Sequence, residues 1–398
     1  MPNDENSRNG LIRMLSLAEN IEMNYFEALL KKINQNIWIC FLSGMISGAV
    51  THMYMLTHTL PNWDDVGNFD AYGVGGEFGR WFLSSLHPVS GIYANPWLNG
   101  VLAIFLLSIA WCFVYATLEL NTKTSAILLP VIMMTFPSLA SFMTYMFTVD
   151  LYAFGFMFVC IGAYLAKRYR FGIVAACVLQ VFAMGLYQSC VCFTISLFII
   201  MLIIDLTKCR IDAKNSIIKG LQYAASIIIG TIMYIGIAYY RCPEMVETSQ
   251  NGIGSMGAIS LPRLPRLVAK AYLRITRYFI LGDFSFISSL MRKCNLLILV
   301  LIFVGFLSIV KLQKLYKNKL SFTMIICLVL LLPLGLSFVD IMCPDASFTM
   351  LMLYQYALLY VVGLVVYEIC GKLCEEKANN KTEIKVENRS KNKSEERA

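Results

Sequence analysis

Apolar residues in this chain gather into long runs that are separated by short polar segments. A window of about 19 residues, the length that crosses the hydrocarbon core of a bilayer as a helix, finds about ten such runs. They lie at residues 37–57, 97–117, 127–147, 151–166, 171–187, 189–206, 220–240, 294–312, 322–340 and 348–370. The stretch 171–206 is too long for one helix, and we expect it to break between Gly185 and Ser189. The pattern therefore predicts an all-α polytopic membrane protein with about ten transmembrane helices.

The segments on either side of these runs have a different character. Residues 11–36 carry apolar side chains at helical spacing, which predicts a cytoplasmic amphipathic helix within an N-terminal segment 1–36. Residues 371–398 are rich in Lys, Glu and Asn without apolar periodicity, which predicts a disordered cytoplasmic tail. Residues 37–370 then form a single transmembrane domain.

The composition agrees with this class. Hydrophobic residues make up 58% of the chain and charged residues 15%, and the mean hydropathy is +0.64, which excludes an ordinary soluble protein. The 13 cysteines lie mostly inside apolar runs without a metal-binding spacing, so we expect neither a disulfide framework nor a metal site. The net charge of +8 resides largely in short loops, which is a topology signal and argues against nucleic acid as a partner.

Lys and Arg alternate between the two sides of the predicted bundle. If the N-terminus is cytoplasmic, most basic residues of the short loops fall inside, as the positive-inside rule requires. These inner groups are residues 8–32, Lys123, residues 167–170, residues 208–219, residues 311–319 and the tail. We therefore expect both termini in the cytoplasm and no cleavable signal peptide.

Two longer segments, 58–96 and 241–293, then face the exterior. The second is basic, although it lies on the side where basic residues are rare. Long loops are exported regardless of charge, so simple tolerance explains this as one alternative. The other is that arginines bind a lipid phosphate, because guanidinium matches phosphate oxygens in a bidentate geometry. The candidate phosphate ligands are Arg263, Arg266, Arg274 and Arg277. Residues 264–280 alternate basic and apolar side chains as an interfacial helix would.

The first external segment carries the densest polar chemistry in the sequence, "NWDDVGNFDAYGVGGEFGRWFLSSL" at residues 62–86. The pair Asp64–Asp65 follows the first span closely, where an unpaired carboxylate is costly. A turn or a helix cap would explain it structurally, whereas a general base next to a lipid-borne substrate would explain it chemically. Arg80 could bind phosphate or pair with Glu77. The glycines at 73–79 match no nucleotide-binding spacing.

Several stretches resemble one known family. The order "DD" in the first outer segment, "GRWFLSSL", "Y..NPWLNG" (Tyr93 to Gly100), "SFMTYMFTVDLYAFGFMF" (141–158) and "AMGLYQS" (183–189) is similar to the Gtr-type (GtrII-like) glucosyltransferase domain of bacterial membrane proteins. The resemblance covers roughly residues 38–370 and is strongest over 60–200. It implies a GT-C-like fold, a catalytic carboxylate in the first external loop and a polyprenyl-phosphate sugar donor.

Carried onto this chain, the resemblance makes Asp64 and Asp65 the catalytic candidates and Arg80 a site residue. The resembling segments also contain the other predicted substrate-binding residues, which are Asp70, Glu77, Tyr93, Asp150, Tyr187 and Gln188.

The expected function is transfer of a glucosyl or related residue from the lipid donor to a cell-surface polysaccharide outside a bacterial cytoplasmic membrane. An Asp general base would invert the anomeric centre, with no cofactor; the need for a divalent metal, the sugar, the acceptor and the identity of the base stay open. A separate donor synthase and a flippase are the expected partners, besides the bilayer.

Three alternatives remain. A flippase or transporter for lipid-linked glycans would carry polar residues at the midplane of broken helices, whereas here ionisable residues gather at the outer rim. A polysaccharide polymerase or ligase would also use lipid-linked donors, but it has no need of the Asp pair. A non-enzymatic scaffold would not explain the cluster of carboxylates.

Overall fold

The computed structural model describes residues 34–58, 78–90, 95–242, 261–282, 288–344 and 349–395, and these form helices and turns without a β-strand. Residues 1–33 of the predicted N-terminal segment lie outside this range, as do residues 59–77, 91–94, 243–260 and 283–287 of the two predicted external loops. The long helices are α2 (Gln35–Thr57), α5 (Pro96–Thr117), α8 (Val149–Arg168), α10 (Cys190–Thr207), α11 (Ala213–Arg241), α13 (Ser289–Leu312), α14 (Lys319–Leu336) and α16 (Ala357–Glu395). The shorter helices are α4 (Trp81–Ser90), α6 (Lys123–Thr135), α7 (Pro137–Met143), α9 (Gly172–Leu186), α12 (Leu264–Thr276) and α15 (Phe338–Met342).

The predicted spans correspond to the helices one by one. Eight helical segments in the described part are long and apolar enough to cross a bilayer, α6 and α7 form a bent pair that could make a ninth, and α9 is a shorter apolar helix. The bend between α6 and α7 is 55° and falls at Phe136–Pro137, where proline cannot continue the hydrogen bonding of the preceding helix. The predicted break in 171–206 is also present, between Leu186 and Cys190. The all-α polytopic class is confirmed.

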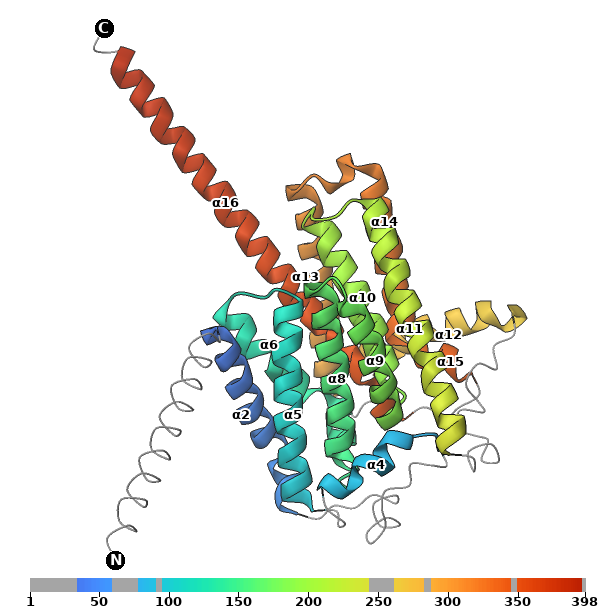
Figure 1. Cartoon of the computed structure of the whole chain (residues 1–398). Coiled ribbons are helices and arrows are strands. Elements are labelled where there is room, and N and C mark those ends of the chain that lie inside the picture. Colours follow the sequence, from blue (N-terminus) through green and yellow to red (C-terminus); the bar gives the residue numbers. More distant parts are fainter. Residues whose placement is uncertain are drawn as a thin grey trace, which may run out of the picture.

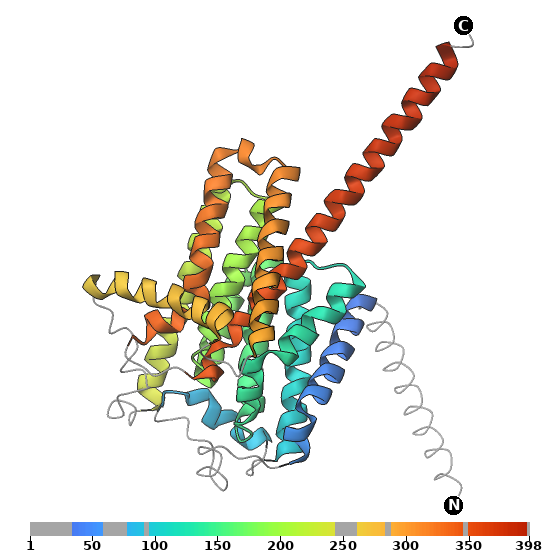
Figure 2. The same cartoon turned by 180° about the vertical axis from the view of Figure 1, so that it is seen from behind.

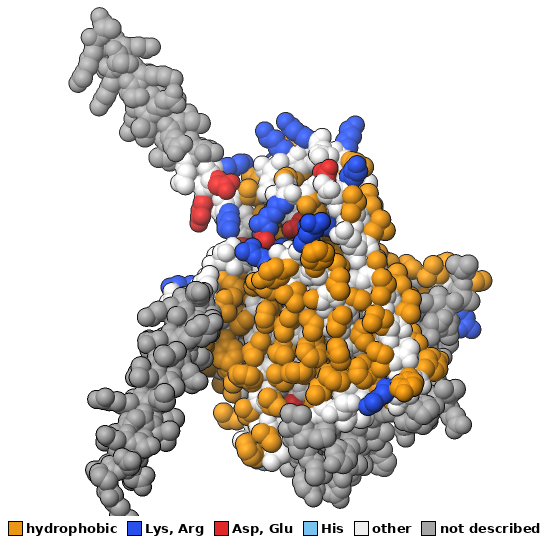
Figure 3. All heavy atoms as spheres, in the orientation of Figure 1, with side chains coloured by type: hydrophobic (Ala, Val, Ile, Leu, Met, Phe, Trp, Pro, Cys, Tyr) orange, Lys and Arg blue, Asp and Glu red, His pale blue; other side chains and the backbone are white. Residues whose placement is uncertain are grey.

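The helices stand side by side in one bundle, from which the end of α16 projects (Figures 1 and 2). Where the sequence analysis expects a tail without regular structure, α16 continues as a helix to Glu395. The boundary between domain and tail at residue 370 stays a prediction. Apolar side chains cover the visible face of the bundle, and Lys, Arg, Asp and Glu side chains (blue and red) gather above them (Figure 3).

Basic residues of separate loops meet at one end of the bundle, which we call the basic end. Lys167 lies in the last turn of α8, Lys208 and Arg210 follow α10, and Lys219 lies in the first turns of α11. Three helices that begin at this end have polar N-caps: the side chains of Thr122, Asp212 and Asn318 accept hydrogen bonds from backbone N–H groups of α6, α11 and α14. The meeting of these basic loops at one end agrees with the prediction that the loops rich in Lys and Arg lie on the same side of the membrane.

Small residues bring α2 against α5. A Cβ atom added to Gly44 would lie 2.7 Å from Ser108 Oγ, and one added to Gly48 would lie 2.7 Å from Ile104 Cγ2. The spacing of the two glycines is that of the G-x-x-x-G motif, which lets helices approach closely in lipid. Close backbone approach therefore holds α2 against α5.

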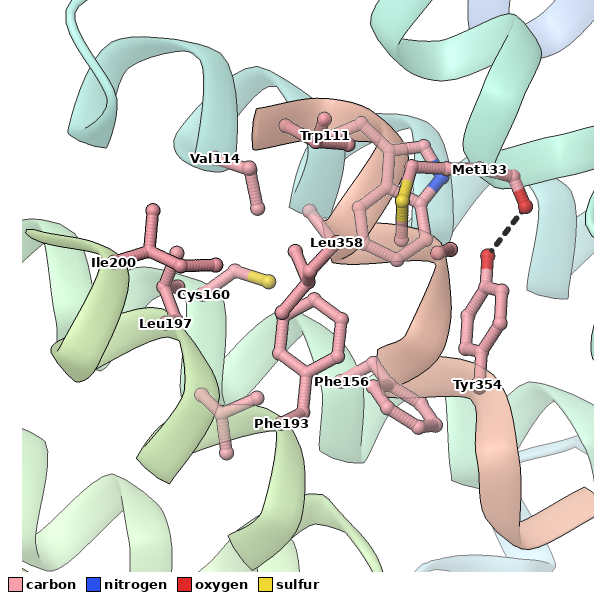
Figure 4. Close-up of a cluster of buried hydrophobic side chains, with 14 of the residues drawn as sticks. Trp111, Val114, Met133, Phe156, Cys160, Phe193, Leu197, Ile200, Tyr354 and Leu358 are labelled. Atoms are coloured by element: carbon pink, nitrogen blue, oxygen red, sulfur yellow. Dashed lines mark hydrogen bonds between the residues drawn. The ribbon is translucent and has the colours of Figure 1, made fainter. Parts of the chain in front are cut away.

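The core lies between α5, α6, α8, α10 and the start of α16 (Figure 4). Trp111, Phe156 and Phe193 are buried there, and the ring of Tyr354 packs edge-on against Trp111 and Phe156, with centroids 5.7 and 5.2 Å away. The Tyr354 hydroxyl donates to the carbonyl of Met133 at 2.8 Å, which satisfies its polar atom inside the core. Tyr354 belongs to the 3₁₀ segment η7 (Met350–Tyr356), which is thereby locked into the bundle.

The helix α4 lies across the opposite end of the bundle, whereas α12 projects sideways from the bundle, closer to its middle (Figure 1). In α12 Leu267 and Ala271 are buried, whereas most other side chains are exposed, so the helix is amphipathic as its sequence predicts. A π-helical segment, η5 (Arg277–Leu281), continues it and ends at Gly282 in the left-handed conformation.

Candidate active site

The predicted catalytic pair lies outside the described residues. The same holds for Asp70, Glu77 and Tyr93, so the structure gives no geometry for five of the candidates, among them Asp64 and Asp65. The chain enters the described part again at Phe78, directly before Arg80 and α4. The site is therefore built from the residues that this external segment leads into.

Arg80 binds side chains from two helix ends that are far apart in sequence. Its Nε donates to Gln188 Oε1 at 3.2 Å, and its Nη1 donates to the Tyr152 hydroxyl. Gln188 lies in the break between α9 and α10, and Tyr152 lies in the first turn of α8. The predicted residues Arg80 and Gln188 are thus in direct contact.

Aromatic rings enclose the guanidinium group. Its Cζ atom lies 5.3 Å from the ring centroid of Phe78, 5.4 Å from that of Tyr152 and 5.5 Å from that of Tyr187. The rings of Tyr152 and Tyr187 stack at 4.6 Å. We call Phe78, Arg80, Tyr152, Tyr187 and Gln188 the Arg80 cage.

The cage leaves polar groups unused. Arg80 is half-buried, and no carboxylate among the described residues forms an ion pair with it. The hydroxyl of Tyr187 is buried and has no hydrogen-bond partner in this part of the chain. A buried hydroxyl and a cation without a carboxylate partner are costly unless a ligand or water completes them.

Tyr234 completes the support of the cage, and the sequence analysis missed it. Gln188 Nε2 donates to the Tyr234 hydroxyl at 3.0 Å and also to the carbonyl of Phe78. The Tyr234 hydroxyl in turn donates to the carbonyl of Gly79 at 3.2 Å. Tyr234 lies in the apolar run of α11, where one hydroxyl gives no signal in the sequence, so only the fold reveals this role.

Asp150 is buried at the start of α8, and the structure shows no direct contact between it and Arg80. Its Oδ1 accepts a hydrogen bond from Asn99 Nδ2 at 3.3 Å, and Asn99 Oδ1 accepts one from the backbone N–H of Asn95. A carboxylate in the first turn of a helix is stabilised by the helix dipole. In the described part of the chain, Asp150 therefore joins the beginnings of α5 and α8.

The predicted phosphate-binding arginines divide into two groups. Arg263, Arg266 and Arg277 are exposed on and around α12. Arg274 is largely buried and holds Asp340 of α15 in a bidentate pair, with Nη2 2.8 Å from Oδ1 and Nε bound to Oδ2. Lys270 Nζ lies 3.4 Å from the same carboxylate and donates to the carbonyl of Pro344 at 3.0 Å.

Asp340 is fully buried and was not among the predicted residues. The signal existed, because Asp340 is a single carboxylate within an apolar run, and such residues are functional or paired by default. Its side chain joins α15 to α12, so it anchors the amphipathic helix to the bundle.

No group of three or more His, Cys, Asp or Glu side chains suited to a metal ion occurs in the described ranges. The chemistry available there is that of a guanidinium, tyrosine hydroxyls and an amide at the end of a helical bundle. Such groups bind oxyanions and polar ligands.

Comparison with known proteins decides the family. The model of the family described as glucosyl transferase GtrII matches residues 53–374, which is most of the chain. The chain belongs to the GtrII family. Neither the curated proteins nor the solved structures searched contain a significant match.

This GtrII protein is thus a membrane glucosyltransferase, and the resemblance read from its motifs is confirmed. The matched range includes both the Arg80 cage and the pair of Arg274 with Asp340, and it ends within α16. The family placement favours the enzyme hypothesis over the transporter and scaffold alternatives.

Proposed function

We propose that this glucosyltransferase takes its sugar from a polyprenyl-phosphate donor and that the Arg80 cage binds the phosphate of that donor. One observation carries the proposal: Arg80 is a half-buried cation that is held in place by Gln188, Tyr152 and aromatic rings without a described carboxylate partner. A rigid guanidinium with no carboxylate partner among the described residues suits phosphate oxygens, which it can bind through two parallel N–H groups.

The leaving group explains why such a cation is needed. When the bond between the anomeric carbon and the phosphate oxygen breaks, the electron pair stays on the phosphate, and negative charge develops there. A fixed donor in a water-poor site stabilises this charge without reorganisation, and one such donor is worth roughly 3–4 kcal/mol. The Tyr187 hydroxyl, buried and without a described partner, can complete the binding of the sugar or the phosphate.

Asp64 or Asp65 supplies the base in this proposal. The carboxylate takes the proton from an acceptor hydroxyl while the oxygen of that hydroxyl bonds to the anomeric carbon and the polyprenyl phosphate leaves. The anomeric centre is thereby inverted without a covalent enzyme intermediate. Both residues precede Arg80 in one continuous segment of the chain, which supports a shared site.

The proposed site faces the exterior of a bacterial cytoplasmic membrane, with both termini inside. Support comes from the basic loops that meet at the end of the bundle away from the Arg80 cage. Outside the membrane there is no pool of sugar nucleotides, so the donor must be made and flipped by other proteins. The acceptor class is a cell-surface polysaccharide.

The test uses purified protein in proteoliposomes with a polyprenyl-phosphate glucose donor and an isolated polysaccharide acceptor. We expect Arg80→Gln to reduce transfer by about 100- to 1,000-fold, and Arg80→Lys to restore only part of the loss because a point charge replaces the planar fork. Asp64→Asn or Asp65→Asn should reduce transfer by about 100- to 10,000-fold. Asp70→Asn should have a milder effect.

The matched control is Arg241→Gln, which removes an exposed cation from the last turn of α11. It should leave transfer unchanged. Wild-type rates in both Asp variants would refute the proposed base, and equal losses in the Arg80 and Arg241 variants would refute a phosphate site in the cage. Transfer from UDP-glucose at the same rate would refute the lipid donor.

A further inference from the structure

A polar cavity of about 510 Å³ lies at the basic end, away from the Arg80 cage. Its walls come from the start of α2, the end of α5, the turn after α5 and the end of α8. The polar side chains that line it include Asn34, Thr117, Glu119, Lys167 and Arg168. None of these residues has a role in the proposed transfer reaction.

The surroundings of the cavity carry excess positive charge. Glu119 pairs with Lys167, Lys208 and Arg210, and Asp205 pairs with Lys167, Arg210 and Lys219. Burial alone would raise the pKa of Glu119, but the hydrogen bond from Arg210 and the charges of the two lysines outweigh burial and hold that pKa below its usual value.

Glu368, beside the cavity, is bound by the backbone of Asn121 and Thr122. Of these charged groups, Lys167, Arg168 and Glu119 line the cavity itself, so its wall has two cations and one carboxylate and favours an anion.

Two polar groups on the cavity wall lack hydrogen bonds. The Nζ atom of Lys167 is buried and forms ion pairs with Glu119 and Asp205 at 3.4 and 3.6 Å, but it donates no hydrogen bond within the described residues. The hydroxyl of Thr117 is buried without a partner as well. Both groups can donate to an oxygen that occupies the cavity. Arg168, which also lines it, is exposed and forms no described ion pair.

An apolar groove of about 660 Å³ continues from this cavity along the side of the bundle. The groove and the cavity share four wall residues, Asn34, Ile37, Ala116 and Tyr164. Trp38, Phe41, Phe105 and Phe113 are among the other groove residues, and Trp38 and Phe105 are exposed at the membrane-facing surface of α2 and α5. The cavity, with its excess of positive charge, thus opens directly into the apolar groove.

We propose that the cavity and the groove together form a binding site for an anionic phospholipid of the leaflet at the basic end. The phosphate accepts hydrogen bonds from Lys167, Thr117 and Arg168, and one acyl chain lies in the groove against Trp38 and Phe41. A soluble anion would use the cavity but leave the groove without an occupant, whereas a lipid fills both. Basic pockets between transmembrane helices recognise lipid headgroups in this way. The bound lipid would join α2 to α5 and α8.

The test needs no glycosyl transfer, so it stands or falls separately from the proposed function. Purified protein in detergent is titrated with phosphatidylglycerol or phosphatidylcholine that carry brominated acyl chains, which quench nearby tryptophan fluorescence. Phosphatidylglycerol should quench at concentrations about tenfold lower than phosphatidylcholine. The Trp38→Phe variant should lose this saturable quenching, which assigns the signal to the groove.

Variants of the residues that bind the lipid phosphate test the polar half of the proposed site. Arg168→Gln should weaken phosphatidylglycerol binding by about tenfold, and Thr117→Val by about threefold, as expected for a charged and a neutral hydrogen bond. The control is Arg170→Gln, which removes a cation of the same turn that packs on Phe171 and does not line the cavity. It should bind like the wild type. Equal quenching by the two lipids, or equal weakening in the Arg168 and Arg170 variants, would overturn the proposal.

Discussion

Removal of Arg274 tests whether this predicted phosphate ligand acts on structure instead. Asp340 is fully buried, and Arg274 binds both of its carboxylate oxygens. Loss of one partner of a buried pair leaves an uncompensated charge and costs about 3–5 kcal/mol. Lys270 remains 3.4 Å from Asp340, so we expect Arg274→Met to lower the free energy of unfolding by about 3 kcal/mol, the lower limit of that range. This corresponds to more than a 100-fold rise in the unfolded fraction.

A double-mutant cycle separates pairing from other effects. Arg274→Met with Asp340→Leu removes both charges and replaces them by apolar side chains, so the double variant should be more stable than either single variant and within about 1 kcal/mol of the wild type. Lys270→Met is the control, because its side chain is more exposed, and it should cost no more than about 1 kcal/mol. Unfolding by urea in mixed micelles, followed by tryptophan fluorescence, measures all four variants.

Activity decides between the two roles of Arg274. If the pair is structural, folded Arg274→Met protein should retain its transfer rate per molecule and its dependence on donor concentration. A variant as stable as the wild type that no longer uses the donor would refute the structural reasoning and would favour Arg274 as a phosphate ligand.

Other positions give independent tests. Gly48→Leu should disrupt the contact of α2 with α5 and lower the thermal stability, because even a Cβ atom would meet Ile104 at 2.7 Å. Gly236→Ala, where no atom lies within 4 Å, should preserve stability or raise it by up to about 1 kcal/mol. Equal behaviour of the two variants would contradict this packing. The pKa of Glu119 is lowered in the folded protein, so its charge stabilises above the ordinary pKa of 4.5 and this contribution is lost as the pH falls further. The difference in thermal stability between wild type and Glu119→Gln should therefore be full at pH 7 and shrink below about pH 4.5; a difference that does not depend on pH would exclude this charge effect. In a variant that keeps only the exposed Cys209, an impermeant thiol reagent should label permeabilised cells but not intact ones, and labelling of intact cells would invert the predicted topology.

Much of the fold follows from local properties of the chain. The lengths of the apolar runs predict the helices, because an unpaired backbone group is costly in lipid and only a helix satisfies its own groups locally. Gln188 and Ser189 mark the break between α9 and α10, since they interrupt a continuous apolar run. The motif "AMGLYQS" also directs attention to Tyr187 and Gln188, and the structure places both beside Arg80.

The contacts of the candidate site do not follow from local sequence patterns, because they join residues far apart in the chain. Arg80 meets Gln188 across 108 positions, and Tyr234 meets Gly79 across 155. No periodicity encodes such contacts, which depend on how helix ends are placed next to each other. Asp340 and Arg274 are both visible in the sequence as charged residues, but only the fold shows that they pair with each other.

Hydrophobic length and loop charge are properties of single segments, and they suffice to specify the class of this protein, its approximate number of spans and the polarity of its loops. The partner of each buried charge is a property of the packed bundle. In the low dielectric of that bundle a cation such as Arg80 or Arg274 is stable only beside specific groups. The tertiary structure therefore decided that Arg274 pairs with Asp340, whereas Arg80 stands among aromatic rings without a described carboxylate.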